Sequence, residues 1–349
     1  MKRARIVCWM VLVLAAVFTP RSIYAANAVV GNGSPASCTE AAFDAALATA
    51  SNGGGVITFN CGPNPVTISF TVAKTVVLGN VTIDGGGRIV LKAGNNERHF
   101  FAGSGVTFRL KNITLREGDS LVSGGALELS GATVTLDNVQ LLNNASLVTG
   151  GAIYCYDGTL TVNNSTLQGN TAAERGGAIY NDGCTVTIAN STLRSNRTLN
   201  SISQGGAIFN QTAGQLTINQ TLLQDNQSPD GGGLYVASGS SATLTGATLR
   251  ANRGGYGGGL ENSGAVTINQ SLLDGNIVTG SGGGLWNLDG HVVMKQTSVR
   301  NNRAYEGGGI NSYGNAVELT DVNITDNIAT GSHGGGIYHG GGTLFVTNA

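Results

Sequence analysis

A column of aromatic residues is the set of side chains whose type and spacing suggest binding chemistry. Each follows the Ile or Leu of a repeated glycine motif, so alternation along a strand should point it outward while its neighbour points inward. An exposed aromatic row can stack on sugar rings, whereas stacking between repeats would contribute about 0.5–1.5 kcal/mol per pair. Glu261 and Asn311 occupy two positions of the column, and the candidate ligand-binding residues are Tyr154, Tyr180, Phe209, Tyr235, Trp286 and Tyr338.

Catalysis on a polysaccharide needs other residues. Glycoside hydrolysis uses paired carboxylates, and a lyase uses an acidic calcium cluster beside a Lys or Arg base. The acidic residues here are scattered singly, although Glu174 with Asp182, or Asp230 with Glu261, could converge from different repeats. Solvated loop charges are the favoured interpretation, and we predict no catalytic residue.

Metal and cofactor chemistry also lack a motif. Two of the four histidines, His333 and His339, share one repeat, but two histidines are too few ligands for a typical protein metal site. The calcium-binding nonapeptide repeat is absent. The sequence therefore predicts no metal and no cofactor.

The elements that position these side chains come from an internal repeat. The motif Gly-Gly-[Ala/Gly]-[Ile/Leu] occurs nine times from Gly124 to Gly334, at intervals of 25 to 29 residues. A second column, an apolar residue followed three positions later by asparagine, drifts with it. Its asparagines are Asn144, Asn170, Asn196, Asn226, Asn252, Asn276, Asn302 and Asn327.

Each repeat reads as about three short strands. Stretches such as Leu160-Thr161-Val162 alternate with period two and are bounded by Gly, Asn and Asp turns. Three strands in about 25–26 residues indicate one coil of a parallel β-helix, in which coils stack about 4.8 Å apart. The Ile and Leu of the motif then form an interior row, and the paired glycines supply positive φ at a corner.

Two polar columns support this register. Asparagine tolerates the left-handed conformation and can hydrogen-bond along a ladder of identical amides. Arg250, Asp274 and Arg300 take one position in three consecutive repeats, so stacking should place the carboxylate between two guanidinium groups. Exposed ion pairs contribute about 1 kcal/mol or less.

The N-terminus predicts export. Residues 1–28 contain Lys2, Arg3 and Arg5, an apolar run of 13 residues and then small residues, as in a secretory signal peptide. That run is too short to span a bilayer comfortably, and no second long run follows. With 11% charged residues and a net charge of −1, nucleic acid is excluded as an expected partner.

Three further segments follow. Residues 29–61 read as an N-terminal cap with a helix over residues 39–50, for which Ser37 or Thr39 is the N-cap candidate. Residues 62–123 should form irregular coils and residues 124–349 regular ones. The sequence stops in mid-coil, so we expect either a covering partner or further sequence there.

The cysteines suggest an oxidising compartment. After residue 28 there are four, an even number that favours disulfides in an exported chain. Cys38 with Cys61 and Cys155 with Cys184 are the preferred pairs because each joins nearby segments. Free buried thiols are the alternative for the second pair.

Both columns resemble a known family. The GGAI tetrads at 150–153, 176–179 and 205–208, with LQGN, LRSN and LLDGN beside them, are similar to the repeats of polymorphic outer-membrane proteins. The resemblance covers about residues 38–349 and implies export, a right-handed β-helix related in shape to pectate lyases, and often adhesion or surface display. A C-terminal barrel, typical of that family, is not recognisable.

We therefore expect an all-β, right-handed parallel β-helix with a short N-terminal helix, secreted or at the cell surface. Its expected role is non-catalytic, in adhesion, display or envelope structure, with a polysaccharide or a surface protein as partner. The alternatives are a polysaccharide-active enzyme and a non-catalytic glycan-binding module on the same fold.

Overall fold

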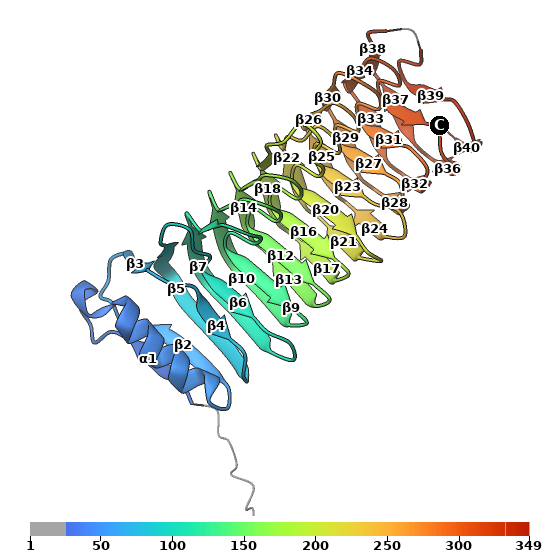
Figure 1. Ribbon diagram of the computed structural model, residues 1–349. Helices are drawn as coiled ribbons and strands as arrows, with labels where there is room; N and C mark the ends of the chain where they lie inside the picture. The colour runs from blue at the N-terminus through green and yellow to red at the C-terminus, as the bar shows by residue number, and fades with distance from the viewer. Residues whose placement is uncertain (1–25, 332, 349) are drawn as a thin grey trace, which may run out of the picture.

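The protein is an all-β parallel solenoid of about 12 turns with one α-helix. The computed structural model describes residues 26–331 and 333–348, so most of the predicted signal peptide lies outside the described residues. In Figure 1 the coils follow one another along a single axis, from α1 (Glu40–Ser51) at one end to β40 (Thr343–Thr347) at the other.

Most regular coils contain three strands and a two-residue fourth, which in the coil after Gly205 is reduced to single bridges made by Gln227. One example is β12 (Ile153–Tyr156), β13 (Thr159–Asn163), β14 (Thr166–Gln168) and β15 (Thr171–Ala172). Every strand pairs in parallel with its equivalent in the next coil, as Ile153 does with Ile179 and Leu160 with Val186. Equivalent side chains therefore stack along the solenoid axis.

The strands form three surfaces. Sheet 1 carries the Ile or Leu of the glycine motif and contains β4 (Lys74–Val76), β6 (Phe100–Ala102), β9 (Leu127–Ser130), β12, β16 (Ile179–Asp182), β20 (Ile208–Gln211), β23 (Leu234–Val236), β27 (Leu260–Asn262), β31 (Leu285–Asn287), β35 (Ile310–Ser312) and β39 (Ile337–His339). Sheet 3 is made of the short strands β8 (Asp119–Ser120), β11 (Ala145–Ser146), β15, β19 (Arg197–Thr198), β26 (Arg253–Gly254), β30 (Ile277–Val278), β34 (Arg303–Ala304) and β38 (Ile328–Ala329).

Sheet 2 is the largest surface. Its early strands are long or irregular: β1 (Ala28–Val30), β2 (Gly55–Phe59), β3 (Val66–Phe70), β5 (Asn80–Ala93), β7 (Thr107–Arg116) and β10 (Thr133–Leu142). Later coils each contribute two strands: β13 and β14, β17 (Thr185–Ala189) and β18 (Thr192–Arg194), β21 (Gln215–Asn219) and β22 (Leu222–Gln224), β24 (Ser241–Thr245) and β25 (Thr248–Arg250), β28 (Ala265–Asn269) and β29 (Leu272–Asp274), β32 (His291–Lys295) and β33 (Ser298–Arg300), β36 (Ala316–Thr320) and β37 (Asn323–Thr325), then β40.

The interior row predicted from the motif is present. Its members from Ile153 to Ile310 are fully buried, while Ile337 in the last coil is half-buried. The first glycine of every pair has φ between 52° and 70°, which L side chains rarely adopt. A Cβ on the second glycine, such as Gly177, would overlap the Gly206 carbonyl, so both positions require glycine.

The asparagine column forms a continuous buried ladder. In a typical step the Asn196 side chain donates to Asn226 Oδ1 at 3.0 Å and to the Leu167 carbonyl at 3.0 Å. The Asn196 backbone N–H donates to the same Asn226 oxygen at 3.0 Å. The ladder therefore satisfies backbone groups at a corner of each coil, as well as the amides themselves.

The expected left-handed conformation lies one residue earlier. Positive φ belongs to the residue before each ladder asparagine, such as Ser195 (54°), Asp225 (53°) and Ala251 (53°). The tight turn is made there, and this frees the asparagine to point inward. The charge column is as predicted, with the Asp274 carboxylate forming ion pairs with Arg250 at 3.9 Å and with Arg300 at 3.4 Å.

The N-terminal end is covered by α1. Thr39 is its N-cap, accepting from the Ala42 N–H at 3.2 Å, which decides between the two candidates. Phe43 lies on the buried face of the helix and packs against Phe70 with ring centroids 4.8 Å apart. The buried Lys74 ammonium pairs with Glu40 at 2.6 Å and Asp44 at 2.8 Å, which fixes the helix to the first coils.

Both predicted disulfides are present. Cys38 with Cys61 ties the segment before α1 to the end of β2. Cys155 with Cys184 joins neighbouring coils, where Cys184 Sγ also accepts from the Gly158 N–H at 3.1 Å. Among the described residues, no helix has the length and apolar character needed to span a membrane.

Candidate functional site

The outward face of sheet 1 carries the predicted aromatic column. Tyr154 and Tyr180 stack with ring centroids 5.4 Å apart, Tyr180 and Phe209 also 5.4 Å apart, and Phe209 and Tyr235 5.0 Å apart. Interplanar angles of 9° to 21° make this a parallel stack across four coils. These rings bind one another, which is the alternative that the sequence left open.

We expected this aromatic row to be exposed, but the rings at its centre are buried. Phe209 is 2% exposed and Tyr235 9% exposed, although both side chains leave the sheet on the outer side. Arg175, the residue before one glycine pair, covers this part of the row, and its guanidinium lies 5.3 Å from the centre of the Phe209 ring. Sequence alternation predicted the direction of the rings but not this cover.

Trp286 and Tyr338 lie farther along the same face and are half-buried. Tyr256, from the loop before its glycine pair, stacks on Trp286 with ring centroids 4.4 Å apart. The ring centroid of Tyr338 lies 5.5 Å from that of Tyr313 and 5.3 Å from that of His333. The six predicted residues are thus brought to one face, in two groups separated by Glu261.

Glu261 interrupts the aromatic column and is the least expected group on this face. It pairs in register with Tyr235 and Trp286 and is 2% exposed. Burial raises the pKa of its carboxyl to about 9, helped by the nearby Asp230 charge and opposed by a hydrogen bond from the Gly231 backbone. Glu261 is therefore a neutral acid at pH 7.

The two carboxylate pairs that the sequence suggested differ in their surroundings in the structure. It brings Asp230 close enough to Glu261 to affect its pKa, and burial also raises the pKa of Asp230. Asp182 instead accepts from the Tyr154 hydroxyl at 3.4 Å and from Gln211 at 3.3 Å. Glu174 lies in an exposed loop, where it lines a hollow of about 140 Å³ with Arg175 and Ile202.

The histidines have separate structural roles. His99 is fully buried, and its Nε2 lies 3.0 Å from the Leu91 carbonyl. His291 pairs with Glu318 at 3.2 Å, and His333 lies 3.5 Å from Glu306. Within residues 26–331 and 333–348 no group of three or more His, Cys, Asp or Glu side chains could hold a metal ion.

A ridge of exposed apolar side chains runs beside sheet 3. Leu121, Leu147 and Leu199 each follow a residue paired in register along β8, β11, β15 and β19, with Ala173 completing the column. The three leucines are 54% to 58% exposed, and Ile202 in the longest loop is 84% exposed. The sequence analysis did not single out this leucine column.

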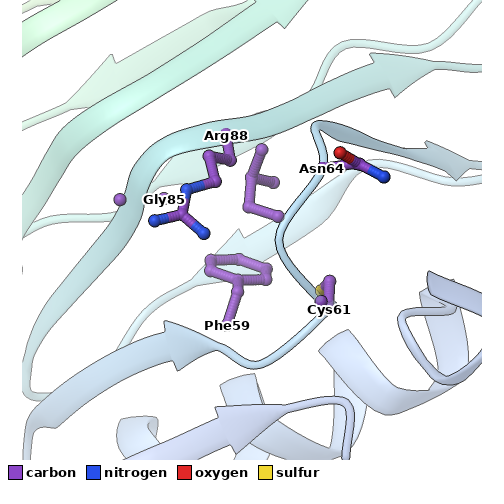
Figure 2. Close-up of a pocket in the computed structure, with 8 residues that line it drawn as sticks. Phe59, Cys61, Asn64, Gly85 and Arg88 are labelled. Carbon is purple, nitrogen blue, oxygen red and sulfur yellow. The ribbon is translucent and has the colours of Figure 1, made fainter. Parts of the chain in front are cut away.

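A small hollow lies near the capped end. Figure 2 shows Arg88 and Phe59 reaching into it, with Cys61 and Asn64 on the loop that borders it. Its volume is about 160 Å³, and Gly85 and Gly86 line it where β5 shifts register between Asp84 and Ile89. Arg88 is exposed and donates to the Pro63 carbonyl at 3.5 Å, so its guanidinium is held by the loop.

The repeats can now be compared with known families. The right-handed beta helix region matches residues 176–349, and the Chlamydia polymorphic membrane protein repeat matches residues 164–182. This chain is a right-handed β-helix protein, one segment of which matches the polymorphic membrane protein repeat. No curated protein and no solved structure gives a significant match.

The family assignment confirms the resemblance drawn from the GGAI and asparagine columns. Residues 164–182 contain one complete corner of this β-helix protein, from the LQGN segment to the glycine pair and β16. Polymorphic membrane proteins are surface-associated, and disulfides are typical of proteins outside the cytoplasm. Both features suggest a surface-associated β-helix protein.

Proposed function

We propose that this β-helix protein is exported and acts without catalysis, in adhesion or surface display, through the apolar ridge beside sheet 3. The observation that carries the proposal is the column of Leu121, Leu147 and Leu199, each more than half exposed in successive or near-successive coils. Contiguous exposed apolar side chains cost solvation free energy and mark contact surfaces. A surface protein is the partner that this ridge fits.

The interior supports a rigid rod behind the ridge. The ladder from Asn144 to Asn327 holds every regular corner, so the loops keep fixed spacing along the axis. Rigid scaffolds with variable loops on one side are typical of binding surfaces. The aromatic stack stabilises the outer face of sheet 1 and leaves the loops to vary.

Adhesion can be measured with beads that carry the purified chain, washed over a layer of the source organism's own cells. Replacing Leu121, Leu147 and Leu199 with serine should reduce bead retention by roughly tenfold, since three exposed leucines would contribute the contact. The matched control replaces Val77 and Leu78, which are 52% and 65% exposed at a different corner, with serine. Equal retention of the two variants would refute the ridge.

The enzyme alternative is tested in parallel. The chain is incubated with a polysaccharide panel, and new reducing and unsaturated ends are counted. Our proposal expects no turnover by the wild type. Turnover that Asp230→Asn or Glu261→Gln abolishes would replace adhesion with catalysis, because the Asp230 carboxylate lies close enough to Glu261 to raise the pKa of its carboxyl.

A further inference from the structure

Three consecutive coils of sheet 1 contain buried polar atoms without partners. They are Glu261 Oε2 on β27, Trp286 Nε1 on β31, and both amide atoms of Asn311 on β35. The three residues pair directly in register, Glu261 with Trp286 and Trp286 with Asn311. They account for four of the eight buried side-chain nitrogen and oxygen atoms that have no hydrogen-bond partner within the described residues.

The inward side of the same strands shows that pairing is available in this fold. Asn262 donates to Asn287 Oδ1 at 2.9 Å, and Asn287 donates to Ser312 Oγ at 3.2 Å. Asn262, Asn287 and Ser312 each directly follow one of the unpartnered residues in sequence. Buried polar atoms in native proteins are nearly always hydrogen-bonded, so a cluster of exceptions points to a group that binds there.

The chemistry of the cluster is neutral and mixed. The indole N–H only donates, the Asn311 amide both donates and accepts, and the buried carboxyl of Glu261 holds its proton at neutral pH. Sugar hydroxyls also donate and accept, so they match such a set without leaving a charge unpaired. A charged ligand would lack a counter-charge in the Trp286 and Asn311 part of the cluster.

Tyr256 covers this cluster. Its ring stacks on Trp286 at 4.4 Å with an interplanar angle of 28°, yet it is 41% exposed. The Tyr256 backbone is fixed, because its N–H donates to the Pro229 carbonyl at 3.0 Å and its carbonyl accepts from the Gly231 N–H at 3.1 Å, so the ring can leave Trp286 only by rotation of the side chain. A Cβ on Gly280 would overlap the Tyr256 ring, so this glycine is needed for the covered arrangement.

We infer that Glu261, Trp286 and Asn311 form a subsite for one neutral pyranose ring, which takes the place of Tyr256 on the indole face. The ring stacks on Trp286, and its hydroxyls bond to the Glu261 carboxyl and the Asn311 amide. Tyr256 is the cover that leaves when the sugar binds. This inference extends the proposed adhesive role by naming a ligand class, but it uses sheet 1 and not the leucine ridge.

The sequence supplies a convenient signal for the test. The chain has two tryptophans, Trp9 and Trp286, so in a Trp9→Phe background Trp286 is the single indole. Neutral tetrasaccharides of glucose, mannose, galactose and N-acetylglucosamine are titrated while its fluorescence is recorded. Tetragalacturonate, which is charged, serves as the comparison ligand. We expect a saturable change with at least one neutral sugar and none with tetragalacturonate.

Variants separate the subsite from general loss of folding. Asn311→Ala should weaken binding about tenfold, because it removes hydrogen bonds made only to the sugar. Tyr256→Ala should tighten binding about threefold, because the cover no longer competes. Tyr156→Ala, an aromatic change at an exposed position of β12 outside the candidate column, should leave the affinity unchanged. Circular dichroism confirms that each variant is folded.

Three outcomes would overturn the subsite. They are no fluorescence change in either the wild type or Tyr256→Ala at millimolar sugar, a preference for tetragalacturonate, and equal weakening by Tyr156→Ala and Asn311→Ala. Bead adhesion is measured on the same variants. Adhesion without sugar binding would remove the subsite and keep the ridge, whereas sugar binding with adhesion insensitive to the ridge leucines would do the reverse.

Discussion

Neighbouring coils are held together by different contacts in residues 26–123 and in the regular coils after them. The N-terminal part relies on a phenylalanine cluster around Phe43, on Lys74 and its two carboxylates, and on the Cys38–Cys61 disulfide. The regular coils rely on columns in which each residue contacts its own equivalent. A terminal coil has no equivalent on one side, so it needs contacts that do not repeat.

This comparison predicts how far along the solenoid a destabilising substitution lowers stability. In a solenoid each coil contacts only its neighbours, so stability is a sum of local terms and unfolding need not be all-or-none. Amide hydrogen exchange, which resolves individual coils, is the appropriate measurement. The predictions below run from the largest expected effect to the smallest.

The largest effect should come from Phe43→Ala. Phe43 is fully buried against Phe59, Phe70 and Phe100, and truncating such a ring costs about 4 kcal/mol. Exchange should accelerate across residues 26–123 and stay slow in the coils after residue 180. Val29→Ala, at an exposed position of β1, is the control. Uniform acceleration along the whole chain would show that the two regions do not differ as described.

Breaking the asparagine ladder should lower stability somewhat less than Phe43→Ala does, but it should affect coils on both sides of the substitution. Asn226→Ala removes the bonds to Asn252 and the Leu193 carbonyl, and it leaves the Asn196 backbone N–H without its acceptor. The expected loss is about 3 kcal/mol, confined to coils near the change. Asn323→Ala, at an exposed position of β37, should change stability by less than about 0.5 kcal/mol. If both substitutions cost the same, the ladder does not hold the corner.

Glu261 makes the regular coils sensitive to high pH. Its pKa is raised to about 9 when folded, so the native state keeps a proton that the unfolded state releases above about pH 4.5. Stability should therefore fall by roughly 2 kcal/mol between pH 5.5 and 7, and continue to fall towards pH 9. Glu261→Gln should abolish this slope. A wild type with flat stability over this range would contradict the buried neutral carboxyl.

His99 gives the N-terminal part the opposite dependence. Burial lowers its pKa to about 4, so the unfolded chain takes up a proton below about pH 6.5 while the native state does not. Stability of the first coils should drop by about 1 kcal/mol from pH 6 to pH 5. His99→Gln should remove the drop, and His291→Gln, at an exposed position of β32, should not. Opposite slopes in the two regions would sharpen the comparison.

The sequence predicted the repeating parts well, since each repeat states the pattern again. The parallel β-helix, the interior row, the asparagine ladder, the N-terminal helix and both cysteine pairs are as expected. What failed depends on contacts between loop and sheet. Nothing in the spacing of Phe209 shows that Arg175 will cover it, or that Tyr256 will lie on Trp286. The left-handed turn was misplaced by one residue because Ser, Asp and Ala fill that position as well as Asn and Gly.

The loop at 197–204 carries one more consequence. Ladder partners Asn196 and Asn226 are 30 residues apart where most others are 26 apart, yet the ladder and both neighbouring sheets keep their register. The additional residues project laterally from the solenoid as a longer loop, with Ile202 at its most exposed point. A foreign peptide inserted beside Ile202 would therefore be carried on the same rod without altering its length, which makes this loop a site for engineered antigen presentation.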